Sequence, residues 1–161
     1  SLQYLTIRPV VRVLSRAAPH PQSLSRGDME ENDSLLPAGE GLGMREETLN
    51  VELDNYVLLS PEAINLDESN RVKLQAVINQ EPLALIEYWA VDPDYDGKVF
   101  RSVWQDYRGN TDNDGDPLRV VTKAVLTLPA KQGARRVCVR VVDVFGFEAE
   151  VVVSVALPRE I

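Results

Sequence analysis

The chain has 161 residues, 44% of them hydrophobic, which is enough for one globular domain with its own core and excludes a wholly disordered chain. Its 17 basic and 25 acidic residues give a net charge of −8, which disfavours independent binding to nucleic acid because the phosphate backbone is also negative. The sequence contains no run of about 18 apolar residues and no basic-then-apolar leader, so it predicts neither a membrane span nor a signal peptide.

The first 47 residues divide into a strand-like stretch and a polar stretch. Alternation over residues 1–14 predicts a strand or arm with an irregularity at Pro9. Its expected apolar face consists of Leu5, Ile7, Val11 and Val13. Residues 15–47 are rich in Pro, Gly, Ser and acidic residues, so we expect a flexible loop or linker, with a long ordered loop across the domain as the alternative. The opening at Ser1, without a methionine, suggests a piece of a longer protein.

From residue 48 to residue 158, short apolar stretches alternate with turn-rich connections. The alternation predicts strands at residues 49–53, 72–78, 85–91, 99–107, 118–128, 137–143 and 148–155. A helical turn is expected at Ser60–Ala63, where a serine cap precedes a proline, and Gly146 can supply positive φ in the last hairpin. The pattern predicts an all-β fold, an antiparallel immunoglobulin-like β-sandwich over residues 48–158 with an irregular N-terminal arm.

Two acidic stretches have the ligand spacing of a calcium loop: D-P-D-Y-D-G from Asp92 and N-T-D-N-D-G-D from Asn110. The closing position of each is a valine, Val103 and Val121, where calcium loops carry a carboxylate, and both stretches lie between strands rather than helices. Asp, Asn and Gly are also the residues that tight turns select. Two interpretations therefore remain, turns or a weak calcium site. The calcium ligands would be Asp92, Asp94, Asp96, Asp112 and Asp114.

No catalytic set is recognisable in the sequence. The only histidine, His20, lies between two prolines, where nothing would orient it. Glu46 and Glu47 belong to a polar segment without an apolar pocket that would raise a carboxyl pKa. The only cysteine, Cys138, lies between two valines and is expected to be a buried, inert thiol, which also means no disulfide. We expect no catalytic residue and no cofactor in this chain, and a cytoplasmic location.

Aromatic residues are concentrated between residues 88 and 107 and alternate with arginines. They could stack on bases or peptides, but tryptophans that fill the sandwich core are the simpler interpretation. On the alternation of its strand, Trp89 is expected to point inward. The residues expected to define the fold or to face a partner are Tyr88, Trp89, Trp104 and Arg108.

Two segments resemble the C-terminal region of site-specific adenine DNA methyltransferases of the type III restriction-modification kind. They are I-E-Y-W-A-V-D-P-D-Y-D-G-K-V-F-R-S-V-W-Q-D-Y-R, residues 86–108, and V-R-V-V-D-V-F-G, residues 139–146. Such enzymes methylate adenine N6 from S-adenosylmethionine with an aspartate-proline-proline-tyrosine motif and a glycine-rich loop. Neither motif is present, because Asp92-Pro93 and Asp116-Pro117 continue as Asp94 and Leu118.

The resemblance implies a non-catalytic accessory domain for subunit assembly or for positioning the enzyme on DNA. S-adenosylmethionine would then bind in the parent enzyme. The implied partners are other domains or subunits of that enzyme, with DNA contact only in the full-length protein and no membrane. The alternative is a calcium-binding, adhesion-type immunoglobulin-like module.

Overall fold

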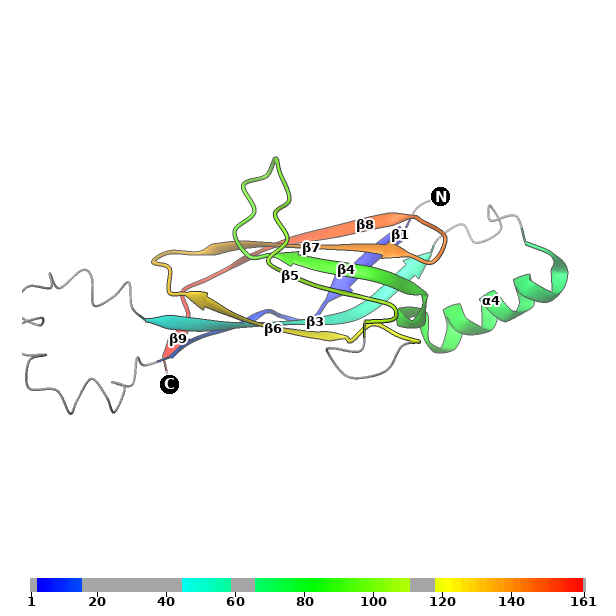
Figure 1. The fold of residues 1–161 in the computed structure, drawn as a ribbon, viewed down its shortest axis with the longest axis horizontal. Helices are drawn as coiled ribbons and strands as arrows, with labels where there is room; N and C mark the ends of the chain where they lie inside the picture. Colours follow the sequence, from blue (N-terminus) through cyan, green and yellow to red (C-terminus); the bar gives the residue numbers. More distant parts are fainter. Residues whose placement is uncertain (1–2, 16–44, 59–65, 111–117, 161) are drawn as a thin grey trace, which may run out of the picture.

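Two β-sheets pack face to face as a sandwich in the part of the chain that the computed structural model describes, residues 3–15, 45–58, 66–110 and 118–160 (Figure 1). The first sheet has five strands in the order β1-β3-β2-β9, with β6 also paired to β3. Its strands are β1 (Gln3–Ile7), β2 (Val11–Ser15), β3 (Glu46–Leu58), β6 (Lys123–Pro129) and β9 (Arg159–Glu160).

The second sheet has four strands in the order β5-β4-β7-β8. Its strands are β4 (Ile86–Asp92), β5 (Trp104–Tyr107), β7 (Arg135–Asp143) and β8 (Glu148–Val155). β2 and β9 run parallel, and the other paired strands are antiparallel. Two mainly antiparallel sheets packed on each other confirm the predicted all-β sandwich.

The N-terminal stretch is a broken strand that runs along β3. Leu5 pairs with Tyr56 and points into the core, as predicted. After the break at Pro9 the alternation shifts, so Arg12 is 3% exposed on the inner face and Val11 is 40% exposed on the outer face. The predicted apolar face is therefore wrong in β2. Proline cannot donate to the ladder, and the irregular residues around it reverse which side chains point inward.

The segment predicted as a strand at residues 72–78 is instead part of helix α4 (Glu68–Gln80). The helix begins at Asp67, whose carboxylate accepts a hydrogen bond from the Asn70 backbone at 2.8 Å. Val72, which strand alternation would bury, is exposed. The residues of α4 that pack on the core are Leu74, Val77 and Ile78. Their i, i+3, i+4 spacing is helical, so the strand prediction used the wrong period. Among the described residues, no helix has the length and hydrophobicity that crossing a membrane requires.

The other predicted strands are present with shifted ends. The strand expected at residues 99–107 is limited to β5, and the one expected at 118–128 begins at Lys123. The last hairpin is β7 and β8, with Gly146 at φ 89° in its connection. The short helix η2 (Pro82–Leu85) precedes β4. The helical turn predicted at Ser60–Ala63, the predicted linker between residues 16 and 44, and residues 111–117 lie outside the described residues.

The core lies between the inner faces of the two sheets. The fully or almost fully buried core residues that β3 and β6 contribute are Leu49, Val51, Leu53, Tyr56, Leu58, Ala124, Leu126 and Leu128. Those from β4 and β7 are Ile86, Trp89, Val91, Val137, Val139 and Val141. A buried hydrogen bond of 2.6 Å from the Tyr56 hydroxyl to the Asp143 carboxylate also links the sheets. Burial, followed by the neighbouring Asp143, raises the pKa of Tyr56, so the phenol remains a donor.

Candidate functional site

The sequence motif of residues 86–108 forms β4, β5 and the loop between them. Trp89 is completely buried, as its strand pattern predicts, and its indole nitrogen donates to the Val121 carbonyl at 2.8 Å. The half-buried ring of Trp104 lies 4.6 Å from that of Trp89, centroid to centroid, at a tilt of 59°. Both tryptophans are therefore committed to packing between the sheets, which gives them fold-defining positions.

Arg108 connects β4 with helix η2 and with the connection that precedes β6. Its guanidinium pairs with the Glu87 carboxylate at 3.0 Å and donates to the carbonyls of Ala84, Ile86 and Leu118. Together with the Glu87 pair, these bonds use most of the N–H donors of the guanidinium group. The side chain consequently serves the fold more than it serves a partner.

Tyr88 occupies the outer face of the same sheet. It is half-buried, and its hydroxyl donates to the Gln105 side chain at 3.0 Å. Its cross-strand neighbour Tyr107 is exposed. Tyr88 therefore lies on the outer face, where its side chain is partly accessible to solvent.

The Asp92 loop uses its carboxylates to hold its own backbone. The buried Asp92 accepts from the backbone N–H groups of Asp94, at 3.0 Å, and Arg101, at 2.8 Å. Asp96 accepts from the Val99 N–H at 2.9 Å and from the Arg101 guanidinium at 2.9 Å. The Val99 bond first, and then Arg101, lower the pKa of Asp96 to about 2. These are the local hydrogen bonds of Asx-type turns.

The same bonds weaken the calcium interpretation of the loop. Asp92, Asp94 and Asp96 already accept hydrogen bonds from the chain, and a metal ion would have to displace them. Within the described ranges, no group of three or more His, Cys, Asp or Glu side chains is arranged to hold a metal ion. Asp112 and Asp114 lie outside these ranges. For the Asp92 stretch, which the structure describes, these bonds favour the turn interpretation over a calcium site.

A calcium titration tests this reading of the loop. We expect millimolar calcium to leave the melting temperature unchanged and to release no heat in calorimetry, because the Asp92 loop is closed by its own N–H groups. Magnesium at the same concentration controls for ionic strength. A rise in melting temperature with calcium alone would restore the calcium-binding alternative, since a ligand that binds only the folded state stabilises it.

A buried ion cluster that the sequence interpretation missed connects the two sheets at the end that carries the Asp92 loop. The Glu47 cluster consists of Arg12, Glu47, Asp94 and Arg135. Glu47 is 0% exposed, and its Oε1 accepts from Arg12 Nε at 2.9 Å and from Arg135 Nε. Arg135 also donates to both Asp94 oxygens at 2.8 Å. Two cations and two anions are therefore paired, with Arg12, Glu47 and Arg135 buried and Asp94 at the surface.

The remaining donors of the two arginines bind backbone carbonyls. Arg12 donates to Lys131 at 2.6 Å, to Gly133 at 2.7 Å and to Ala156 at 3.0 Å. Arg135 donates to the Pro129 carbonyl at 2.7 Å. The cluster thereby connects β2, β3 and β7 with the β6–β7 connection and the end of β8. Its guanidinium groups are used by the fold, so they are not a site for an external anion.

Strand parity could have indicated the cluster. Glu47 shares its strand face with Leu49 and Val51, and Arg135 shares its face with Val137 and Val139. A charged residue in phase with a buried apolar row is a candidate for burial with a partner. The interpretation of Glu47 as a solvated acid was wrong because it relied on the polar residues that precede β3.

Cys138 lies on the outer face of β7, and its thiol is buried as the sequence predicts. Its sulfur is 3.6 Å from a Glu150 carboxylate oxygen. Burial first, and then the Glu150 charge, raise the pKa of Cys138 to about 12.

We expect a disulfide exchange reagent at about pH 8 to leave the folded protein unmodified and to titrate one thiol in urea. Rapid modification of the folded protein would show that the thiol is accessible as thiolate.

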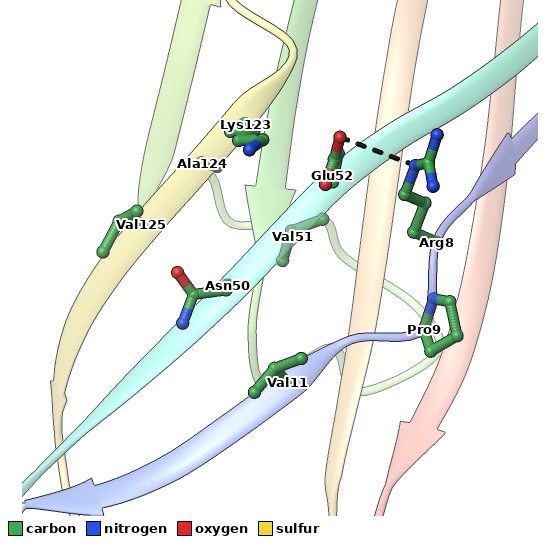
Figure 2. A pocket seen from close by; sticks show the side chains of 9 residues that line it. All are labelled: Arg8, Pro9, Val11, Asn50, Val51, Glu52, Lys123, Ala124 and Val125. Atoms are coloured by element: carbon green, nitrogen blue, oxygen red, sulfur yellow. Dashed lines mark ion pairs between the residues drawn. The ribbon is translucent and has the colours of Figure 1, made fainter.

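A shallow hollow of about 170 Å³ lies on the outer face of the first sheet (Figure 2). At one end Arg8 Nε lies 3.5 Å from Glu52. Toward the other end Val11 and Val125 flank the Asn50 amide (Figure 2). The lining contains no nucleophile with a base beside it, and its mixture of apolar and charged groups suits contact with a protein surface more than catalysis.

Most of the polar side chains described above form hydrogen bonds within the chain. Aromatic packing, the Glu47 cluster and the Arg108 contacts all stabilise the sandwich. Comparison of the chain with protein-family models, with curated protein sequences and with solved structures finds no match.

Proposed function

We propose that this chain is a non-catalytic accessory C-terminal domain of a cytoplasmic, adenine-specific DNA methyltransferase of the restriction-modification kind. Its role is subunit assembly or the positioning of the enzyme on DNA. The proposal is supported by the likeness of residues 86–108 and 139–146 to that region of such enzymes. Since the sequence lacks their methyltransferase motifs, S-adenosylmethionine binds in the parent enzyme and not in this chain.

The observation that carries the proposal is the structural use of the shared motif. Trp89, Asp92 and Arg108 each direct polar atoms to the chain's own backbone. A motif kept for chemistry would present those groups to a substrate, whereas this one orders the β4–β5 region. These internal contacts therefore fit an accessory scaffold better than an enzyme.

Assembly is the favoured role because of charge. The chain carries −8, and phosphate contact requires basic residues to be gathered on one face. In the hollow on the first sheet, the basic Arg8 is paired with Glu52, while Val11 and Val125 are exposed. Paired charges and exposed apolar side chains favour a protein partner over a nucleic acid.

For DNA, we expect the chain alone to bind a duplex with a dissociation constant weaker than about 10⁻⁶ M at physiological salt. A gel-shift or anisotropy titration measures it, with a basic DNA-binding domain as positive control. Half saturation at nanomolar protein would contradict the preference for assembly.

The parent polypeptide tests the proposal itself. We expect the coding region upstream of Ser1 to encode an aspartate-proline-proline-tyrosine motif in the same reading frame. Deletion of this domain from that enzyme should preserve S-adenosylmethionine binding in calorimetry. It should change either the number of subunits per particle, measured by light scattering, or the placement of the enzyme on DNA. An upstream region without the motif, or a deletion that alters neither property, would refute the proposed function.

A further inference from the structure

Strand β8 forms the margin of the second sheet (Figure 1). At its first residue, the Glu148 carbonyl accepts a hydrogen bond from the Gln3 side chain of β1. The Asp143 N–H donates to the Phe147 carbonyl at 2.9 Å, which fixes the phase of the β7–β8 ladder. Because antiparallel ladder bonds alternate, the odd-numbered residues of β8 face β7 and the even-numbered residues face outward. Glu150, Val152 and Ser154 therefore present N–H and C=O groups at a free edge.

Two other edge strands in the described ranges, β6 and β5, are better protected. β6 begins with Lys123 and ends at Pro129, and both residue types discourage a further strand. β5 spans only 4 residues. By contrast, β8 between residues 149 and 155 contains no proline, no lysine and no bulge, and four of its residues are valine. A long β-branched edge of this kind is normally covered.

A cleft of about 390 Å³ adjoins this edge, and it lies between the Ile7–Val10 break and Val153–Ala156. The inward side chains of β8 beside it are only half-buried, although they pack on the core. These side chains are Ala149, Val151, Val153 and Val155. An added strand would complete their burial and pair the free backbone groups at once.

We propose that the β8 edge is a β-strand addition site for an extended segment of another protein, with β-branched apolar residues at alternate positions and a lysine or arginine at one end. The backbone pairing supplies affinity, and the cleft accepts the alternate apolar side chains. The basic residue is required by charge: Glu148 is exposed and forms no ion pair within the described residues, and the chain carries −8.

A second copy of the chain is a poor occupant, because two molecules of charge −8 repel each other. The inference rests on the assembly role proposed above, since the segment would belong to another domain or subunit of the parent enzyme. It adds the place of contact and the chemistry of the partner.

The test uses the full chain and the synthetic peptide acetyl-Lys-Val-Thr-Val-Thr-Val-Lys-amide. In ¹⁵N NMR spectra we expect peptide addition to shift the amides of Glu150, Val152 and Ser154, and to slow their hydrogen exchange. A peptide with glutamate in place of both lysines should bind at least about tenfold more weakly. Shifts centred on β6, equal binding of both peptides, or no shifts at roughly 1 mM peptide would overturn the proposal.

Two matched proline variants separate edge pairing from general effects. Val152→Pro removes one outward N–H from β8, and Val125→Pro does the same on β6, because the bond from Leu53 N–H to the Thr122 carbonyl places Val125 outward there. Both side chains are exposed, by 43% and 58%. We expect Val152→Pro to weaken peptide binding at least about tenfold and Val125→Pro to leave it unchanged. The reverse order would overturn the proposal.

Val152→Lys is the second variant if circular dichroism shows that Val152→Pro does not fold. It keeps the ladder but places a cation beside the incoming lysines, so it should also weaken binding. Unchanged peptide affinity in this variant, or a dimer mass for the free chain in light scattering, would overturn the proposal.

If the peptide does not bind but domain deletion still disassembles the parent enzyme, only this inference fails. If the peptide binds and the upstream region lacks the methyltransferase motif, only the proposed function fails.

Discussion

Replacement of Trp89 by alanine is expected to destabilise the sandwich by about 3 to 5 kcal/mol and to abolish its cooperative unfolding transition. The side chain is completely buried and packs against Trp104. Its loss leaves a cavity between the sheets and leaves the Val121 carbonyl without the indole donor. Urea denaturation followed by circular dichroism measures the change.

Two further variants locate the cause. Trp89→Phe retains an aromatic ring and should cost less than the alanine variant, although it also removes the donor to Val121. Tyr88→Ala changes the adjacent residue, which is half-buried on the outer face, and should cost no more than about 1 kcal/mol. Trp89→Ala with a near-wild-type melting temperature would contradict the placement of Trp89 in the core.

The sequence predicts the sandwich and most of its strands because period-2 alternation is strong where one face is buried. β7 and β8 are the clearest example, since valine recurs along both strands and Gly146 provides the positive φ of their connection. The position of Trp89 follows from the same periodicity. These features depend on local spacing, which a single sequence displays.

Helix α4 shows where alternation fails. Apolar residues at 72, 74, 76 and 78 fit a strand, while those at 74, 77 and 78 fit a helix, so the pattern alone leaves both open. The capping by Asp67 and the absence of Gly and Pro from Glu68–Gln80 favour the helix. The cap at Asp67 is therefore the local signal that distinguishes the helix from a strand here.

The contacts of the Asp92 loop and of Arg108 could not be predicted, because they depend on which strands become neighbours. Arg108 meets the Leu118 carbonyl, and Asp94 meets Arg135, 41 residues away. A sequence shows the residue types but not these pairings. The inward direction of the Arg12 side chain could not be predicted either, because the break at Pro9 shifts which residues of the strand point inward.

Glu47→Gln is expected to destabilise the protein by about 3 to 5 kcal/mol, the cost of removing one partner from a buried ion pair. The amide has nearly the size of the carboxylate, so little cavity forms. Arg12 and Arg135 would keep their charges at 3% and 2% exposure without the anion that lies between them. Thermal and urea unfolding both measure the change. Glu46→Gln alters the preceding, exposed residue of β3 and should stay within about 0.5 kcal/mol of the original protein.

Asp94→Asn separates burial from ion pairing as the source of this stabilisation. Asp94 contacts the same Arg135 at 2.8 Å, but its side chain is 47% exposed, so water can solvate either partner when the charge is removed. Exposed or half-exposed ion pairs contribute about 0 to 1 kcal/mol, and added salt screens them. We therefore expect Asp94→Asn to cost no more than about 1 kcal/mol, with a smaller cost in high salt, while the cost of Glu47→Gln persists in salt. Equal costs for the two variants would mean that the ion pairs themselves stabilise the junction of the sheets, and that the complete burial of Glu47 is not what makes its charge indispensable.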